Sequence, residues 1–260
     1  MLLSIFLGTF VAGVASVGIA LFLSRSFLSK YPRHMLSLAA GALLATAFVN
    51  LLPEAFESEF SPRTLFFVFF LGLVSVILLD KAEIWHHAHE HDLSLQDGAD
   101  HDHGHVHTAS GSWSVLLGDA IHAFADGVLI ASAFMADWKL GVAASVAVLL
   151  HEVPHHMGDL AVVSHIQKDA RKALLKVSLA GGFTVFGGMV GYGLITAFDA
   201  WLPLFLVVAA SSFTYVALAD LIPQLNTPMP LRQSISQVAW LIAGALLVTG
   251  AVMVVGGHAH

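Results

Sequence analysis

Residues 139–163 read KLGVAASVAVLLHEVPHHMGDLAVV, an apolar stretch that carries a dense group of ionisable side chains. Five of these side chains fall within nine residues: His151, Glu152, His155, His156 and Asp159. A helix of this length can cross a hydrocarbon core of about 30 Å. Within a bilayer an ionisable side chain is costly unless it is paired, hydrated or bound to metal, so it normally faces the interior of a helical bundle. The stretch therefore predicts a membrane-spanning helix with a functional polar face.

The rest of the chain has the composition of an integral membrane protein. Of its 260 residues, 57% are hydrophobic and 11% are charged, whereas about 25% are charged in an ordinary soluble domain. Hydropathy, with Gly, Pro and charge as boundaries, predicts helices at about 2–24, 35–57, 62–81, 112–136, 139–163, 173–197, 202–222 and 235–257. We therefore expect an all-α bundle of eight transmembrane helices, a single domain over residues 1–260, with the fourth and fifth helices at its centre.

The basic residues predict how these helices are oriented. Nine of the eleven Lys and Arg residues fall in alternate connections: Arg25, Lys30, Arg33, Lys81, Lys168, Arg171, Lys172, Lys176 and Arg232. Only Arg63 and Lys139 fall on the opposite side. Because cytoplasmic loops of membrane proteins are enriched in Lys and Arg, we expect both termini to lie outside the cytoplasm, in a plasma or inner membrane.

Two short segments of the chain resemble each other. Residues 50–54 read NLLPE and residues 220–224 read DLIPQ, with the same order of polar, aliphatic and Pro positions. Their predicted helices run in opposite directions, as the halves of an inverted-repeat transporter do. Asn50, Glu54 and Asp220 are therefore candidates for lining an entry or exit route. Hydrogen bonding at two Pro-bearing helix ends explains the same pattern equally well.

The fourth predicted helix carries polar residues that match those of the fifth. Asp119, His122 and Asp126 have the spacing i, i+3 and i+7, and His151 and His155 have the spacing i and i+4, so each group shares one helical face. Both groups lie near the midpoints of their helices, and a short connection joins the two helices. We expect the two polar faces to meet at the same depth in the bundle.

The meeting of these faces predicts a metal site. Its candidate ligands are His122, Asp126, His151, Glu152 and His155. Imidazole and carboxylate ligands suit Zn²⁺ foremost, with Fe²⁺, Mn²⁺ or Co²⁺ as alternatives, and the chain has no Cys for a thiolate site. Three further side chains are candidates for supporting these ligands or lining an exit path: Asp119, His156 and Asp159. The alternative is a buried polar network that only packs the bundle.

Two motifs in these helices resemble those of the ZIP family of divalent metal transporters. His122-Ala-Phe-Ala-Asp126-Gly127 is similar to the family's HNxxDG motif, and residues 151–159, HEVPHHMGD, are similar to the HEXPHEXGD motif of one subfamily. The resemblance implies eight spans with outside termini and uptake of zinc or a similar ion toward the cytoplasm. It also implies that the five candidate ligands bind the transported ion, and it allows a homodimer.

The sequence departs from the family pattern at two positions. Ala123 replaces the usual Asn, and His156 replaces the second Glu of the subfamily motif. The family often has an adjacent second metal site that uses this Asn and a carboxylate from the sixth helix, but residues 173–197 contain no carboxylate. We therefore expect one principal metal, with Glu152 as a bridge to a weaker one. His156 would add a ligand or alter selectivity.

A histidine-rich tract lies in the connection expected at residues 84–111. It contains eight of the sixteen His residues: His86, His87, His89, His91, His101, His103, His105 and His107. Alternate His in a flexible segment favour weak, rapidly exchanging metal binding. The expected orientation places this tract in the cytoplasm, where it would sense or accept metal that leaves the pore. A solvated linker with incidental metal affinity is the alternative.

The sixth predicted helix is rich in glycine. Its glycines are Gly181, Gly182, Gly187, Gly188, Gly191 and Gly193. Because small residues let helix backbones approach closely in membranes, we expect tight packing or sliding at Gly181, Gly182, Gly187, Gly188 and Gly191.

Other classes of function fit the sequence less well. The net charge of −7 and the lack of a basic patch argue against a nucleic-acid partner. The strongest rival is an intramembrane zinc metalloprotease, because His151-Glu152-Val153-Pro154-His155 matches the pattern H-E-x-x-H. Pro154 would distort the turn that sets the ligand geometry of such an enzyme. We therefore expect a transporter and not an enzyme.

Overall fold

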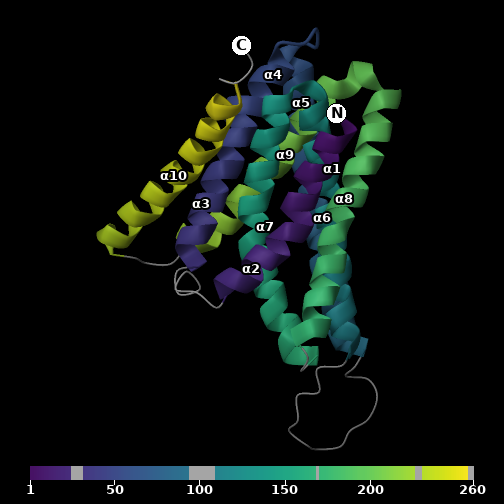
Figure 1. Ribbon diagram of the computed structural model, residues 1–260, viewed down its shortest axis with the longest axis vertical. Helices are drawn as coiled ribbons and strands as arrows, with labels where there is room; N and C mark the ends of the chain where they lie inside the picture. The colour runs from purple at the N-terminus through teal and green to yellow at the C-terminus, as the bar shows by residue number, and fades with distance from the viewer. Residues whose placement is uncertain (25–31, 94–108, 168–169, 226–229, 257–260) are drawn as a thin grey trace, which may run out of the picture.

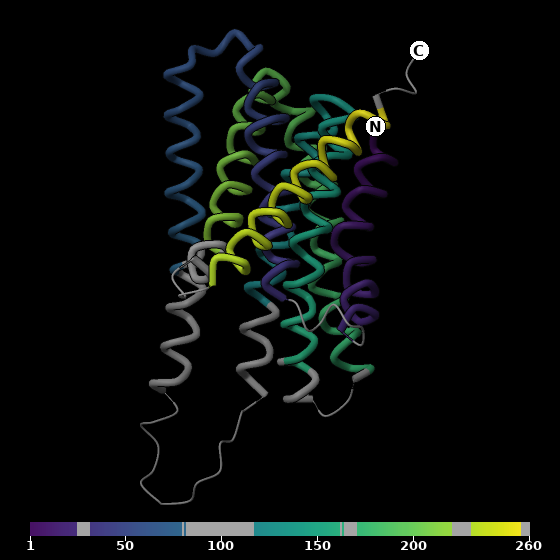
Figure 2. Tube along the Cα trace, turned by 90° about the vertical axis from the view of Figure 1, so that its left-hand side faces the viewer, coloured from purple at the N-terminus to yellow at the C-terminus, as the bar shows by residue number. Residues whose placement is uncertain are grey.

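The computed structural model describes residues 1–24, 32–93, 109–167, 170–225 and 230–256. Within these ranges the chain forms helices joined by short connections, and no strand occurs (Figure 1). The helices run up and down the long axis of the molecule and pack into one bundle (Figures 1 and 2).

The helix order follows the hydropathy pattern. The bounds are α1 Leu2–Phe10, α2 Ser16–Ser24, α3 Pro32–Ala45, α4 Leu52–Phe56, α5 Pro62–Leu93, α6 Ala109–Ala136, α7 Trp138–Gln167, α8 Ala170–Ala197, α9 Leu202–Leu225 and α10 Leu231–Gly256. Two π-helical segments, Val11–Ala15 and Thr46–Leu51, join α1 to α2 and α3 to α4 without a break. A 3₁₀ turn at Asp199–Trp201 precedes α9. The described chain therefore contains eight continuous helical rods.

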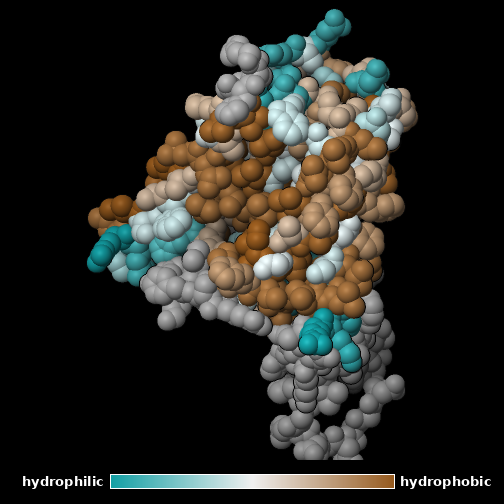
Figure 3. Space-filling model, in the orientation of Figure 1, coloured by the Kyte–Doolittle hydropathy of each residue, from teal (hydrophilic) through white to brown (hydrophobic). Residues whose placement is uncertain are grey.

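The molecule has the character of a membrane bundle. Seven of its helical rods are long and apolar enough to cross a membrane. The rod of the described chain outside this set is α7, which has 30 residues but carries the ionisable group near its middle. On the face seen in Figure 3, apolar residues cover the middle of the bundle and hydrophilic residues lie toward its ends. The expected all-α integral membrane fold is confirmed, while the count of eight spans stays a prediction.

The helix ends differ most from the expected ones around the histidine-rich tract. Helix α5 continues to Leu93 and α6 begins at Ala109, so residues 84–93, expected in the connection, are helical. Residues 80–93 are polar but contain neither Gly nor Pro. Hydropathy therefore marks where the apolar part of α5 ends, while the helix itself continues because nothing in the local sequence breaks it.

The two ends of the bundle differ in charge. The N-terminus, α4 and the last turn of α10 lie at one end, here called the terminal end (Figure 1). The C-terminal ends of α2, α5, α7 and α9 lie at the other end, here called the basic end, because in the sequence the nine Lys and Arg residues of the alternate connections are near these helix ends. The α3–α4 rod rises toward the terminal end and α9 descends from it, so the two Pro-bearing segments are antiparallel as expected.

Glycines hold α6 and α8 in close contact. A Cβ atom at Gly127 would collide with the backbone of Thr184, and one at Gly187 would collide with the backbone of Phe124. Gly182, in contrast, has no atom within 4 Å of the place where its Cβ would lie. Gly181, Gly188 and Gly191 also face other helices. Tight packing is thus confirmed at four of the five expected glycines, and it brings α8 close to α6, to α1 and to the π-helical segment Val11–Ala15.

Candidate metal site

Helices α6 and α7 are antiparallel neighbours joined by a short turn. Asp137 lies in this turn, and its Oδ1 accepts a hydrogen bond of 2.7 Å from the backbone N–H of Lys139. Asp126 lies 11 residues before the turn residue, and Glu152 lies 14 residues after Trp138, the first residue of α7. At 1.5 Å per residue, both lie about 16 to 21 Å from the terminal end, near the middle of a core of about 30 Å.

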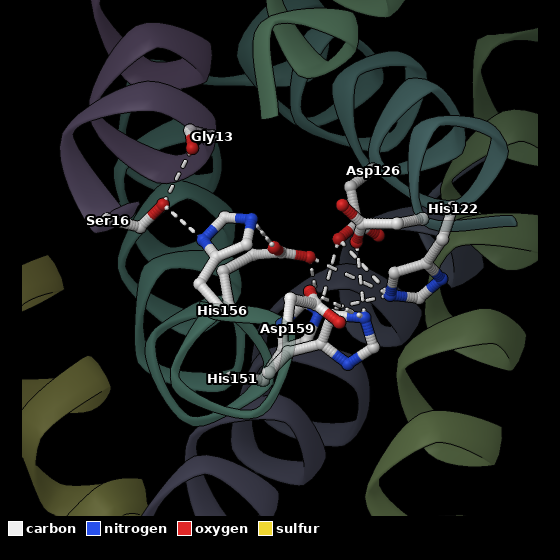
Figure 4. A network of polar contacts seen from close by, with 10 residues as sticks. Gly13, Ser16, His122, Asp126, His151, His156 and Asp159 are labelled. Atoms are coloured by element: carbon white, nitrogen blue, oxygen red, sulfur yellow. Dashed lines mark hydrogen bonds and ion pairs between the residues drawn. The ribbon is translucent and has the colours of Figure 1, made fainter. Parts of the chain in front are cut away.

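Four side chains from these helices converge on one point, here called the central cluster: His122, Asp126, His151 and Glu152 (Figure 4). The His151 Nε2 atom lies 3.1 Å from Asp126 Oδ2, 3.3 Å from Glu152 Oε1 and 3.3 Å from His122 Nε2. The His122 Nε2 atom lies 3.8 Å from each carboxylate oxygen. Ligands bound tetrahedrally to zinc at about 2.0–2.1 Å lie about 3.3 Å from one another. These five distances, 3.1–3.8 Å, are close to the spacing of ligand atoms in a zinc site.

The central cluster concentrates negative charge in a dry environment. Asp126 is 2% exposed, Glu152 is 1% exposed and His151 is 5% exposed. Asp126 Oδ2 and Glu152 Oε1 have no hydrogen-bond partner among the described residues. Buried carboxylates of this kind are costly unless a cation compensates them. A divalent cation at this point would balance both negative charges and would be coordinated by all four side chains.

His155 lies apart from the other four predicted ligands. Its Nε2 atom is 3.2 Å from Asp119 Oδ1 and 3.7 Å from Asp159 Oδ2. These three residues form a second possible metal-binding group, here called the outer group, in which the His155 side chain is 47% exposed. His155 follows His151 by four residues, which displaces it by about 6 Å toward the basic end. Of the five predicted ligands, the structure thus brings together four, and it gives Asp119 and Asp159 a place beside the fifth.

His156 is completely buried between Glu152 and a residue that the sequence analysis missed. Its Nε2 atom lies 3.1 Å from Glu152 Oε2, and its Nδ1 atom lies 3.1 Å from the hydroxyl of Ser16 (Figure 4). The Ser16 hydroxyl donates a 2.7 Å hydrogen bond to the carbonyl of Gly13. A serine in the apolar stretch 2–24 is the only sequence signal for this contact, and nothing in the sequence links it to a residue 140 positions away.

The three residues proposed for an entry or exit route do not meet. The side-chain amide of Asn50 donates a 3.3 Å hydrogen bond to the carbonyl of Ala45 in its own helix. Glu54 is exposed near the terminal end, whereas Asp220 lies toward the end of α9 that faces the basic end, and its side chain falls outside the described part. Hydrogen bonding within its own helix is therefore the better explanation for Asn50.

The histidine-rich tract falls largely outside the described structure. His86, His87, His89 and His91 belong to the last turns of α5, but their side chains are not described. His101, His103, His105 and His107 lie outside the described residues. The predicted role of this tract stays a prediction.

The family model for the ZIP zinc transporter matches residues 83–251, which is more than half of the chain. The chain belongs to this family. The human zinc transporter ZIP4 is 42% identical over 114 residues, which cover 43% of this chain and 17% of ZIP4. The human zinc transporter ZIP10 is 32% identical over 144 residues, which cover 54% of this chain and 17% of ZIP10. The Drosophila melanogaster zinc transporter foi is 31% identical over 134 residues, which cover 51% of this chain and 19% of foi. The matched segments thus span less than a fifth of these relatives.

The arrangement of the site does not suit the alternative function, an intramembrane zinc metalloprotease. This agrees with membership of the ZIP family. A metalloprotease of the H-E-x-x-H type binds one zinc with both His and uses the Glu as a general base. In this ZIP protein His151 lies in the central cluster and His155 in the outer group, and Glu152 Oε1 lies among the possible ligands. The structure therefore does not support the protease alternative.

Proposed function

We propose that this ZIP protein carries divalent first-row metal ions, zinc foremost, across the membrane into the cytoplasm, and that the central cluster is the site that the ion occupies. The observation that carries the proposal is the set of four ligand atoms in the middle of the bundle, three of them on buried side chains, at a spacing close to that of a tetrahedral zinc site. The zinc named in the titles of the related transporters supports zinc as the substrate.

The ligand chemistry explains how the site can hold an ion at this depth. Two ionised carboxylates, Asp126 and Glu152, offset the two positive charges of the metal, so the occupied site carries no net charge. Neutral imidazoles of His122 and His151 replace water molecules that the ion loses on entering the bundle. Fe²⁺, Mn²⁺ and Co²⁺ accept the same ligands and are further candidate substrates.

The outer group offers the next position on the way to the basic end. The His122 ring lies between the two groups, with its centre 5.6 Å from that of His151 and 5.8 Å from that of His155. Rotation of this half-exposed side chain would pass the ion from the central cluster to Asp119, His155 and Asp159. Movement of α6 and α7 against the other helices would expose the path to each side of the membrane in turn.

The proposal includes the membrane topology predicted from the sequence. The basic end faces the cytoplasm, since nine of the eleven Lys and Arg residues belong to it. Helix α7 also crosses the membrane and so brings the number of spans to eight, because it packs against α2, α3, α6 and α8 within the bundle. Both termini then lie outside the cytoplasm of a plasma or inner membrane. A homodimer, an inverted repeat and membership of the HEXPHEXGD-type subfamily complete this prediction.

Zinc uptake into proteoliposomes tests the proposed site. We expect His122→Ala to lower the initial rate of radioactive zinc uptake by at least about tenfold, because it removes one of four ligands. We expect His155→Ala to lower this rate less than His122→Ala does, since His155 belongs to the outer group. The histidine-rich tract is tested by replacing its eight His with Ser, because deletion would also remove the end of α5.

We expect the tract variant to keep most of the uptake. Uptake that survives His122→Ala but disappears with the tract histidines would contradict the proposed transport site. Protein quantity and liposome insertion, measured for each variant, serve as the control.

A further inference from the structure

We propose that α8 binds an anionic phospholipid at the basic end of the bundle, with Arg171, Lys172 and Lys176 holding the headgroup phosphate. The exposed apolar face of the same helix would hold an acyl chain. The inference goes beyond the proposed function and does not depend on which ion is carried. The ligand class is a glycerophospholipid with a net negative charge, such as phosphatidylglycerol.

One face of α8 is exposed along most of the helix. Its large exposed apolar side chains are Leu175, Leu179, Phe183, Phe186, Val190 and Leu194. Successive members of this set are three or four residues apart, so they share one helical face. The helix packs on α6, on α7 and on the rod formed by α1 and α2 with its other side. In a membrane the exposed face therefore lies against acyl chains.

The basic side chains of α8 continue this face toward the basic end. Lys172 lies seven residues before Leu179, and Lys176 lies three residues before it, so both share its face. Arg171 lies one turn before Leu175. Arg171 and Lys172 are exposed and Lys176 is partly exposed. Helix α8 has three basic residues and no acidic one, and in Figure 3 the hydrophilic residues at its lower end border directly on apolar ones.

The three basic residues lie at the depth of lipid headgroups. The apolar span of this helix runs from Arg171 to Ala197, and the exposed Trp201 beyond it marks the opposite membrane boundary. At 1.5 Å per residue, Lys176 lies about 32 Å from Ala197 and Lys172 lies about 38 Å from it. The hydrocarbon core is about 30 Å thick and the headgroups extend it to about 40–45 Å. Lys176 thus lies at the edge of the core, and Lys172 lies among the headgroups.

The clustering of these charges distinguishes α8 from the other helices at this end. There α3, α5 and α10 each carry a single exposed basic side chain in the described part of the chain: Arg33, Lys81 and Arg232. With Lys168, which lies outside the described residues, residues 168–176 contain four basic residues. Clusters of Lys and Arg directly beside a membrane span recognise anionic lipids. Arginine adds a planar donor group that fits a phosphate.

A lipid at this position would bind next to a helix that carries metal ligands. A Cβ atom at Gly187 would collide with the backbone of Phe124, so α8 lies directly on the part of α6 that holds His122. With the proposed topology, the bound lipid belongs to the cytoplasmic leaflet. Because a ligand that binds only the folded protein stabilises it, we expect the lipid to raise the melting temperature.

Thermal unfolding of the full chain in a neutral detergent tests the lipid site. Phosphatidylglycerol replaces phosphatidylcholine stepwise at constant total lipid, and the fraction that gives half of the rise in melting temperature measures the affinity. We expect the variant Arg171→Gln/Lys172→Gln/Lys176→Gln to require at least about tenfold more phosphatidylglycerol than the parent. Lys172→Gln alone should require about threefold to fivefold more, which keeps the test decisive if the triple variant fails to fold.

The matched control is Arg33→Gln/Lys81→Gln/Arg232→Gln, which removes the same charge from the same end of the molecule but from three separate helices. Its requirement should stay within about twofold of the parent. Equal losses in the two triple variants would overturn the site, since they would show a general attraction of the basic end for anions. An unchanged requirement in the α8 variants would also overturn it.

The same measurement separates a lipid from a soluble anion. Inorganic phosphate and glycerol phosphate have the anionic group of the lipid but no acyl chain. We expect neither to raise the melting temperature of the parent, because the apolar face of α8 supplies part of the binding. A rise as large as that given by phosphatidylglycerol would contradict the lipid site.

Discussion

Replacing Asp126 by Asn is expected to reduce the initial rate of zinc uptake by at least about 100-fold. Asn has nearly the same shape as Asp but no charge, so the substitution isolates the electrostatic contribution of the carboxylate. Asp126 is 2% exposed, and its Oδ2 lies 3.1 Å from His151 Nε2. Without this charge, one carboxylate faces two positive charges in a dry site, and the occupied site becomes a net cation within the bilayer. Radioactive zinc uptake into proteoliposomes measures the effect.

Asp137→Asn is the control for this prediction. Asp137 is exposed in the turn between α6 and α7, where its carboxylate accepts the hydrogen bond from Lys139. An Asn side chain can accept the same hydrogen bond, so uptake should stay within about twofold of the parent. Equal rates for Asp126→Asn and the parent would show that the ion does not depend on the central cluster.

Gly187→Leu is expected to lower the melting temperature of the detergent-purified protein by about 6–12 °C, a destabilisation of about 3 kcal/mol. A side chain at Gly187 collides with the backbone of Phe124, and backbone cannot move aside as a flexible side chain can. The helices α6 and α8 would have to separate, which also displaces His122 two residues before Phe124. Thermal unfolding monitored by size-exclusion chromatography measures the change.

Gly182→Leu places the same side chain on the same helix at an open position. We expect its melting temperature to stay within about 2 °C of the parent, because a single exposed apolar residue on a membrane helix disturbs no packing. A similar loss of stability in both variants would contradict the packing of α6 against α8, since it would show that leucine acts through α8 itself.

The periodicity of the sequence predicted which helices carry the site and at what depth. His122 and Asp126 are four residues apart on one helix, and His151 and Glu152 are adjacent on the next, so antiparallel pairing across the turn at Asp137 brings them together. The prediction of these helices and of this depth depended only on helix geometry and on the cost of burying ionisable groups. Close packing at the glycines of α8 was predicted for a similar reason, because small residues mark close helix packing, whereas the helices they contact are known only from the structure.

The division of the polar residues into separate groups could not be predicted in this way. Helical spacing places His151 and His155 on one face, but it does not say that one metal ion cannot reach both. That depends on the position of α6, which gives Asp119 to His155 and Asp126 to His151. Ser16 was missed because its contact with His156 arises from packing between the first and fifth rods, and a lone serine carries no such information.

The most direct test of the central cluster is zinc K-edge X-ray absorption on the purified full chain loaded with one zinc ion per molecule. We expect nitrogen and oxygen ligands at about 2.0–2.1 Å with the scattering of two imidazoles. His151→Ala should reduce this to one imidazole, and replacement of the eight tract histidines should leave the spectrum unchanged. A spectrum that is unaffected by His151→Ala but altered in the tract variant would contradict the central cluster as the zinc site.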